Sequence, residues 1–292
     1  MNFLVSGATG FVGTHLVNYL RGRGQVVDIV SRQPTLGCAW TRESLMPAVL
    51  EADAVVHLAG AGVMDAAWSS ARKLELERSR VEPTALLARV CAEAAAQGRA
   101  PRLISASAVG YYGPRPFEES LQETSPPGED FLARLCAKWE AALGPAREAD
   151  VPVSVVRIGV VLGAGGGALK RMLLPFKLGL GGPLGDGRQG FSWIHIQDLA
   201  RLFEFIAQND ERAGTYNGVA PGCVDQRTFA RALGRALGRP ALLPAPSLAL
   251  RLLLGERSTL VLTGQQVQPT AALAAGFAFE YPLIDEALAA VR

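Results

Sequence analysis

A glycine-rich segment near the N-terminus has the spacing of a phosphate-binding turn. It follows the apolar run 2–6 and begins a helical pattern. In such a strand–turn–helix unit, Gly7 allows a tight turn, Gly10 lets the backbone approach a diphosphate, and Gly13 lets the helix pack closely on the strand. The amides and the dipole of the helix start favour an anion. We therefore expect a dinucleotide to bind at Gly7, Thr9, Gly10, Phe11, Val12 and Gly13.

The residues that end the second predicted strand bear on which dinucleotide binds. NAD sites have an acidic residue there, which holds the ribose 2′-hydroxyl and repels a 2′-phosphate. Here Ser31 and Arg32 offer a hydroxyl and a guanidinium, which suit a phosphate, and Asp28 comes too early, inside the strand. The alternative is that Arg32 is a solvated loop residue. We favour NADP(H) over NAD(H) on this charge argument.

Short apolar runs alternate with helical patterns through the first 160 residues. Strand–helix–strand alternation on this scale gives a parallel, doubly wound sheet. We therefore predict an α/β fold of the Rossmann type with a smaller C-terminal substrate lobe. The predicted strands are 2–6, 25–31, 54–58, 102–105 and 153–158, and the predicted helices are 12–22, 71–96 and 130–148.

The amino-acid composition of the chain changes after residue 160. Residues 163–190 are crowded with glycine, which suits flexible loops over a cleft. From residue 227 the chain is rich in alanine, leucine and arginine, and it ends in a strand-like run, 277–281. We expect a dinucleotide-binding domain over 1–160 with a return segment at about 193–222, and a smaller lobe formed by 161–192 and 223–292.

Composition excludes several classes of partner. The chain has 29 basic and 27 acidic side chains, scattered along helical stretches, so we expect no nucleic-acid partner. Its most apolar later stretch, about 242–255, is too short and too interrupted to span a membrane, and no signal peptide is apparent. The three histidines and four cysteines show no metal-ligand spacing. We expect a cytoplasmic protein that uses no metal and takes a small-molecule substrate; the sequence leaves the oligomeric state open.

Several further motifs carry a resemblance to a known family over essentially the whole chain. They are VVHLAG at 55–60, ISASAVGYYG at 104–113, GDGRQ at 185–189, WIHIQD at 193–198, and the tail from 239 to 282. With them the chain resembles the extended short-chain dehydrogenase/reductase superfamily. More narrowly, it is similar to the atypical epimerase-like branch, labelled NAD-dependent epimerase/dehydratase, which ends in a domain of unknown function. The resemblance implies a nicotinamide coenzyme that serves hydride transfer.

The resemblance also implies roles for individual residues. Leu58, Ala59 and Gly60 would line the adenosine-side ribose and the phosphates. The residues after Ile158 would lie near the nicotinamide. Ser107 matches the serine of the family's active site, and the alternative is an ordinary hydroxyl that bonds nearby backbone.

The chain departs from the family at the Tyr-x-x-x-Lys pair, in which the lysine lowers the pKa of the tyrosine. The matching positions hold Leu132 and Cys136, and Lys138 lies about 200° around the helix from Cys136. Cys136 is either a reactive thiol or, as we favour, a small buried hydrophobe. We expect Tyr111 and Tyr112 to be the replacement proton donors, one facing a substrate and the other packed as core or cleft wall.

Other polar residues have two interpretations each. Trp193 and His195 face a substrate cleft, or His195 is a hydrogen-bonded structural histidine. Arg72, Lys73 and Arg80 reach phosphate or substrate, or each is a solvated charge on a helix face, which we favour for each of them singly.

Two functions follow from these residues. The first is an NADP(H)-binding oxidoreductase or epimerase-like enzyme for an unidentified small polar substrate, in which Ser107 holds a substrate oxygen and Tyr111 or Tyr112 handles the proton. Phe191 stands where nucleotide-sugar enzymes of this kind often carry an arginine, which disfavours a nucleotide sugar. The second is a catalytically degenerate NADP(H)-binding sensor or interaction protein, which the missing tyrosine–lysine pair favours. We prefer the first, because the cleft-side segments keep polar groups.

Overall fold

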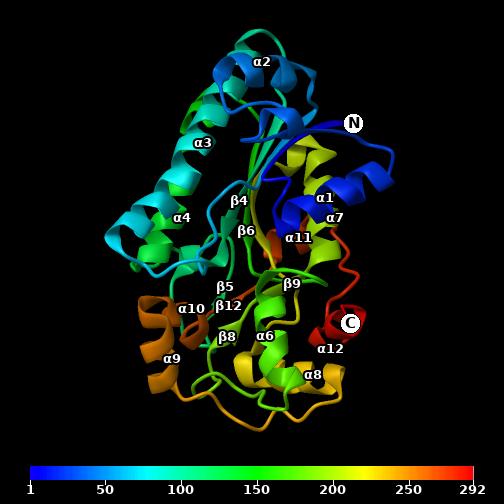
Figure 1. Ribbon diagram of the computed structural model, residues 1–292. Helices are drawn as coiled ribbons and strands as arrows, with labels where there is room; N and C mark the ends of the chain where they lie inside the picture. The colour runs from blue at the N-terminus through cyan, green and yellow to red at the C-terminus, as the bar shows by residue number, and fades with distance from the viewer. Residues whose placement is uncertain (292) are drawn as a thin grey trace.

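A six-stranded parallel sheet forms the centre of the molecule, and its strands are joined by helices. The computed structural model describes residues 1–291, with the backbone alone at Pro34 and Asp210. The strand order is β10-β6-β4-β3-β1-β2, so the predicted Rossmann-type α/β fold is confirmed (Figure 1). The strands are β1 (Asn2–Ser6), β2 (Val26–Val30), β3 (Ala54–His57), β4 (Arg102–Ala108), β6 (Val153–Ile158) and β10 (Gly214–Gly218).

Helices cover both faces of this sheet, because alternate side chains of each strand point to opposite faces. Phe3 and Val5 join one core with α1 and α7, whereas Leu4 joins a second core with α2, α3 and α5. Figure 1 shows α1 and α7 on one side of the sheet and α2, α3 and α4 on the other. The helices are α1 (Phe11–Gly22), α2 (Arg42–Glu51), α3 (Ser70–Ala96), α4 (Phe131–Ala141), α5 (Gly144–Glu148) and α7 (Ile196–Ala207).

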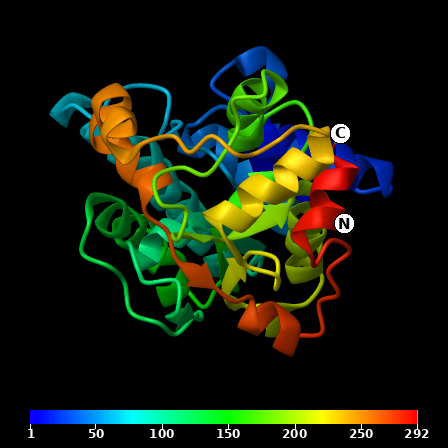
Figure 2. The ribbon, with the colours of Figure 1, turned by 90° about the horizontal axis from the view of Figure 1, so that it is seen from below.

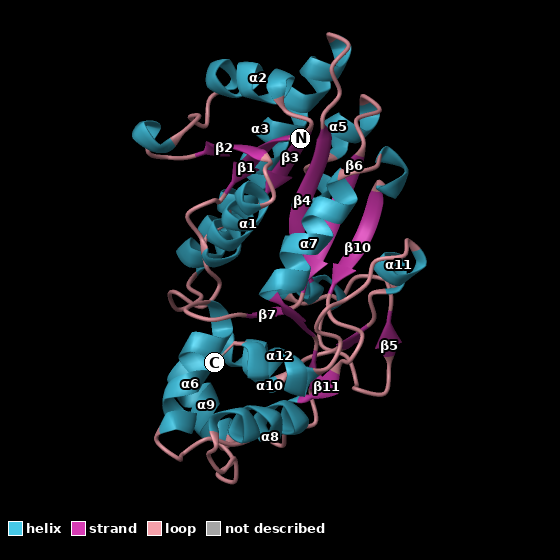
Figure 3. Cartoon of the chain, turned by 90° about the vertical axis from the view of Figure 1, so that its right-hand side faces the viewer, coloured by secondary structure: helices cyan, strands magenta, loops and turns pink. Residues whose placement is uncertain are grey.

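A smaller, mainly helical lobe lies beyond the carboxyl ends of the strands, toward which the arrowheads point (Figure 3). Its helices are α6 (Gly167–Lys177), α8 (Gln226–Leu237), α9 (Ser247–Leu254), α10 (Thr259–Leu262) and α12 (Ile284–Ala290), with α11 (Thr270–Ala274) beside β10. Viewed from below, α8 in yellow and α12 in red lie side by side (Figure 2). Their buried side chains, among them Phe229 and Leu288, form a third core with Phe191 and Trp193.

Short elements connect the sheet to the lobe. Three strand pairs lie outside the main sheet: β7 (Val160–Leu162) with β9 (Trp193–His195), β8 (Gly190–Phe191) with β11 (Val224–Asp225), and β5 (Ser120–Leu121) with β12 (Gln266–Val267). The 3-10 helices are η1 (Pro34–Leu36), η2 (Val109–Tyr112), η3 (Asp210–Arg212) and η4 (Gly255–Ser258). Within residues 1–291 no helix is both long and apolar enough to cross a membrane.

Two predicted elements are wrong. The helix predicted over 130–148 is broken into α4 and α5, since Pro145 occupies the first turn of α5 and lacks the amide that would continue the hydrogen-bond ladder. The strand-like run 277–281 pairs with no strand. Its backbone amides at Glu280 and Tyr281 instead donate to the Asp198 carboxylate, each at 2.9 Å.

Candidate functional site

The glycine turn has the close contacts that a phosphate-binding turn requires. Gly7 has φ +71°, and a Cβ there would lie 2.7 Å from the Leu58 carbonyl carbon. A Cβ on Gly13 would lie 2.2 Å from the carbonyl oxygen of Gly7. Gly10 caps α1 without a side-chain hydrogen bond, so the first amides of the helix have no acceptor within it. The turn therefore offers a row of free N–H donors to an anion.

Phe11 connects this turn to the smaller lobe. Its ring lies so close to the loop before α6 that a Cβ on Gly166 would be 2.2 Å from Phe11 Cδ2, and one on Gly163 or Gly167 would be 2.9 Å from other ring atoms. The sequence predicts Phe11 in the turn and flexible loops at 163–190, whereas the glycines at 163, 166 and 167 leave room for the Phe11 ring. The high density of glycines in this segment was the signal in the sequence. Glycine is needed at these positions because the Phe11 ring occupies the space that a Cβ would take.

The other predicted coenzyme residues lie along the same edge of the sheet. The ends of β1, β2 and β3 are neighbours, since Ser6 is in register with both Val30 and His57. Arg32, just after β2, has an exposed side chain, and the Ser31 hydroxyl accepts from the Gln33 amide at 3.0 Å. The fold thus brings the glycine turn, Ser31, Arg32 and the segment Leu58, Ala59 and Gly60 to one edge.

A buried hydrogen bond fixes the start of that last segment. Ser6 Oγ lies 2.6 Å from His57 Nδ1 and accepts from the Leu58 amide at 3.2 Å. Burial lowers the pKa of His57 from 6.5 to about 3, so its imidazole is neutral. The Ser6–His57 hydrogen bond thus connects the ends of β1 and β3 next to the glycine turn.

Ser107, at the end of β4, is bonded to a buried ion pair that was not predicted from the sequence. Its hydroxyl donates to Glu140 Oε1 at 2.7 Å. The Glu140 carboxylate also accepts from Arg157 Nε at 2.9 Å and from a terminal nitrogen of Arg157 at 2.8 Å. Only 12% of the Glu140 side chain and 6% of the Arg157 side chain are exposed. An Arg in a strand and a Glu on a helix showed no signal of pairing in the sequence.

The two tyrosines of η2 have different environments. Tyr112 is fully buried; its hydroxyl donates to Asn217 Oδ1 at 2.7 Å and accepts from Arg157 at 3.0 Å. Burial raises the pKa of Tyr112. Tyr111 is half-buried, and its ring centroid lies 3.4 Å from Arg157 Cζ. Tyr112 is therefore the packed member of the pair, and Tyr111 is the one with exposed surface.

Helix α4 carries no replacement for the tyrosine–lysine pair among its described side chains. Cys136 is buried, and burial together with the nearby Glu140 carboxylate raises the pKa of its thiol to about 12. It is a small buried side chain and not an activated thiol. Lys138 lies on the surface, where it donates to both carboxylate oxygens of Glu77 at 3.0 and 2.9 Å.

Trp193 and His195 do not face a cleft, and that prediction is corrected. Trp193 is fully buried, and its indole N–H donates to the Gly222 carbonyl at 3.0 Å. His195 is the N-cap of α7: its Nδ1 accepts from the Gln197 amide at 3.2 Å, and its ring lies 3.9 Å from that of Tyr281. Burial lowers the pKa of His195 to about 4. Of the two interpretations, the structural histidine is the one that the geometry supports.

Four arginines hold the backbone of the loop that follows β3 and Gly60. Its carbonyl oxygens accept from guanidinium groups at residue 61 (from Arg80, 2.9 Å), residue 62 (from Arg72, 2.6 Å) and residue 64 (from Arg171 and Arg257, 3.1 Å each). Arg80 is half-buried and only 12% of the Arg72 side chain is exposed, which corrects the prediction of a solvated charge for both. Lys73 forms an ion pair with Glu256 at 2.6 Å.

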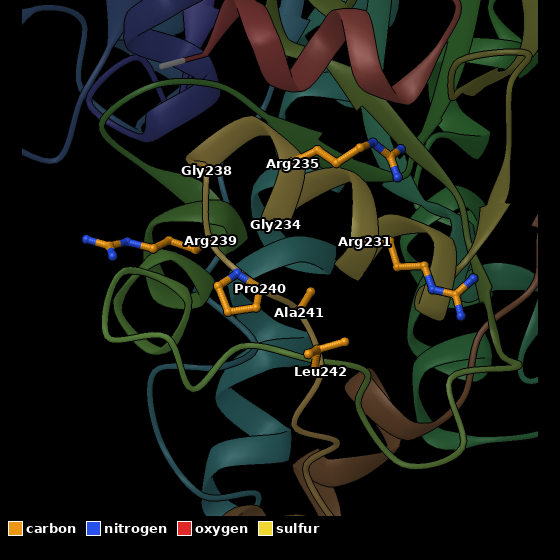
Figure 4. A pocket seen from close by; sticks show the side chains of 8 residues that line it. All are labelled: Arg231, Gly234, Arg235, Gly238, Arg239, Pro240, Ala241 and Leu242. Atoms are coloured by element: carbon orange, nitrogen blue, oxygen red, sulfur yellow. The ribbon is translucent and has the colours of Figure 1, made fainter.

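Two other features of the described residues offer no site. In the part of the chain that the structure describes, no group of three or more His, Cys, Asp or Glu residues is placed to hold a metal ion. A surface hollow at the end of α8 is lined by Arg231, Arg235 and Arg239, but the Arg239 guanidinium points the opposite way from those of Arg231 and Arg235 (Figure 4). That of Arg235 is bonded to Asp285 at 2.6 Å.

Comparison with known proteins agrees with this geometry. The model of the NAD dependent epimerase/dehydratase family matches residues 3–218, and that of a domain of unknown function, DUF1731, matches residues 245–291. Epimerase family protein SDR39U1 of Mus musculus is 44% identical over 295 residues, which cover 99% of this chain and 98% of that protein.

Solved structures support the same assignment. The crystal structure of human epimerase family protein SDR39U1 (isoform 2) with NADPH is 39% identical, with a TM-score of 0.91 over 100% of this chain and 99% of that one. UDP-glucose 4-epimerase of Thermus thermophilus in complex with NAD, 20% identical with a TM-score of 0.77 over 100% and 98% of the two chains, shares the fold. This chain belongs to the NAD dependent epimerase/dehydratase family and ends in a DUF1731 domain.

Proposed function

We propose that the protein is an NADP(H)-binding oxidoreductase or epimerase-like enzyme that acts on a small polar substrate. The observation that carries the proposal is the common edge that holds the glycine turn, Arg32 and the segment after β3. The human relative with a TM-score of 0.91 was crystallised with NADPH, which supports the choice of coenzyme.

Different residues on that edge would bind different parts of the coenzyme. The free amides of the α1 start would hold the diphosphate, as the dipole of a 12-residue helix favours an anion there. The exposed Arg32 guanidinium and the Ser31 hydroxyl would hold the 2′-phosphate. When bound, the nicotinamide ring supplies hydride transfer.

The candidate reaction site lies at the ends of β4 and β6. The Ser107 hydroxyl donates its proton to Glu140, so toward a substrate it can only accept a hydrogen bond. Tyr111, stacked on Arg157 and partly exposed, is the better candidate to pass a proton, whereas Tyr112 is placed to hold Arg157. A substrate hydroxyl would suit this arrangement, since it can donate to Ser107.

Coenzyme binding and turnover are tested separately. Titration with NADPH and with NADH, followed by reduced-nicotinamide fluorescence, should show tighter binding of NADPH. Oxidation of NADPH is then screened with sugars, carbonyls and quinones, and reduction of NADP with the corresponding alcohols. Turnover should be lost in Tyr111→Phe while NADPH still binds. Absence of NADPH binding in the unmodified protein would overturn the proposal.

A second function rests on a specific observation. Glu140 holds the Ser107 hydroxyl, and α4 has no tyrosine–lysine pair, so a protein that binds NADP(H) without chemistry, as a sensor or interaction protein, would have this site. It would be favoured if no substrate class were turned over and a partner protein bound only the NADPH-loaded form.

A further inference from the structure

Arg80 has an unusual environment for a charged side chain. It projects from α3 into the interface with α4, where its guanidinium carbon lies 5.2 Å from the centroid of the Trp139 ring. One terminal nitrogen donates to the Leu76 carbonyl at 3.1 Å and the other to the Ala61 carbonyl at 2.9 Å. A guanidinium has five N–H donors and only these two donate to described residues, so three remain available, among them Nε–H.

The positive charge of Arg80 also has no ion-pair partner among the described carboxylates. Arg157, the other guanidinium in this part of the molecule, is bonded twice by Glu140. Arg80 is bonded by two neutral carbonyl oxygens, and burial lowers the pKa of its guanidinium. A half-buried charge without a counter-charge is costly, so it indicates an anion that is absent from the protein itself.

Two contacts place this charge between the coenzyme edge and the reaction site. On one side, a Cβ on Gly60 would lie 3.3 Å from Arg80 Cζ, so the guanidinium lies directly against the segment after β3. On the other side is the Trp139 ring of α4, and Cys136 lies one helical turn before Trp139. The Arg80 charge lowers the pKa of the Cys136 thiol against the larger effect of burial.

We propose that Arg80 binds the nicotinamide half of the coenzyme, through a diphosphate oxygen or a hydroxyl of the adjoining ribose. Cys136 stands where the resemblance places the lysine of the tyrosine–lysine pair, and Arg80 supplies from α3 the positive charge that α4 lacks. The proposal rests on the NADP(H) function proposed above. It makes Arg80 a coenzyme-binding residue distinct from Arg32, which would hold the adenosine half.

Two ligands separate the halves of the site. NADPH occupies both halves, whereas adenosine 2′,5′-bisphosphate has the 2′-phosphate but neither the second ribose nor the nicotinamide. Arg80→Met removes the charge and keeps the length of the side chain, and Arg80→Lys keeps the charge. Arg78→Met is the matched control, because Arg78 lies on the same helix in a solvent-exposed pair with Glu82.

Arg80→Met should weaken NADPH binding roughly tenfold or more, the effect of losing a charge-assisted hydrogen bond, and should leave the bisphosphate affinity unchanged. Arg80→Lys should recover part of the loss, and Arg78→Met should bind both ligands normally. Ligand-free Arg80→Met should melt at a lower temperature, since it loses two hydrogen bonds to carbonyl oxygens, and an unchanged bisphosphate affinity would show that the site still folds. NADPH affinity should also depend less steeply on salt in this variant than in the unmodified protein.

The inference is overturned if Arg80→Met binds NADPH normally, or if it loses affinity for both ligands in proportion to a loss of stability. If Arg80→Met does not fold, Arg80→Gln, which keeps donors without the charge, is titrated in its place with the same expectations. Failure of the unmodified protein to bind NADPH would instead overturn the proposed function, so the two failures are distinguishable.

Discussion

Ser107 donates a 2.7 Å hydrogen bond to Glu140, the carboxylate that also holds two nitrogens of Arg157. One acidic side chain thus joins the end of β4 to the end of β6 through α4. It also fixes the guanidinium on which Tyr111 is stacked. Both polar groups of the candidate reaction site therefore depend on Glu140.

Loss of Glu140 should be strongly destabilising. Glu140→Ala leaves Arg157 charged, buried and unpaired, which should lower the free energy of unfolding by about 3–5 kcal/mol. Asp285→Ala is the matched control: it breaks the pair with Arg235, whose side chains are 59% and 60% exposed, and should change stability by less than about 1 kcal/mol. Urea denaturation measures both. Equal costs for the two variants would contradict this account of the buried pair.

A methyl group at Gly166 should disturb the contact with Phe11. Gly166→Ala places a Cβ where the Phe11 ring already lies, and overpacking of this kind costs about 1–3 kcal/mol. The cost should be smaller when Phe11→Ala is also present. Gly22→Ala, at a helical glycine whose Cβ would contact nothing, should instead be neutral or stabilise by up to about 1 kcal/mol. Thermal unfolding of Gly166→Ala, Phe11→Ala, their double variant and Gly22→Ala tests the coupling; strictly additive effects would argue against it.

Arg32 should determine the choice of coenzyme. In Arg32→Gln the 2′-phosphate loses its guanidinium, so the affinity for NADPH should fall roughly tenfold while that for NADH stays the same. Calorimetric titration with each coenzyme measures both constants. An equal loss for NADPH and NADH would assign Arg32 to a part that the two coenzymes share.

Two buried histidines should make the protein less stable at mildly acid pH. Their pKa values in the folded state, about 3 for His57 and about 4 for His195, lie below the ordinary 6.5. Above pH 6.5 both are neutral whether the chain is folded or unfolded. Below it, only the unfolded chain takes up protons, so the free energy of unfolding should fall by up to about 1.4 kcal/mol per pH unit for each histidine.

Urea titrations between pH 7.5 and pH 5.5 measure this slope, in a range where most carboxylates stay ionised. His195→Asn keeps an N-cap acceptor and removes the titrating ring, so its slope should be shallower than that of the unmodified protein. Parallel slopes would show that His195 is not the source.

The sequence predicted the sheet well because local pattern determines it. The bounds of β1 and β6 agree with the predicted 2–6 and 153–158, and the glycine turn lies where its spacing indicated. The pairing of Glu140 with Arg157 was not predictable, since it depends on how α4 docks beside β6. Likewise, the packing of Arg80 against Trp139 was not predictable, because the local sequence is the same whether this face of the helix is exposed to solvent or packed on another helix.

Met64, in the loop after β3, connects the sheet domain to the smaller helical lobe through hydrogen bonds. Its carbonyl oxygen is shared by Arg171 of α6 and Arg257 of η4, while Arg72 and Arg80 hold the two residues at 61 and 62 from α3. Any motion that parts the helical lobe from the sheet must break the two bonds at residue 64 or carry this loop with it. The loop follows Gly60, beside the edge where the coenzyme would lie. Such a motion would therefore displace backbone next to the coenzyme.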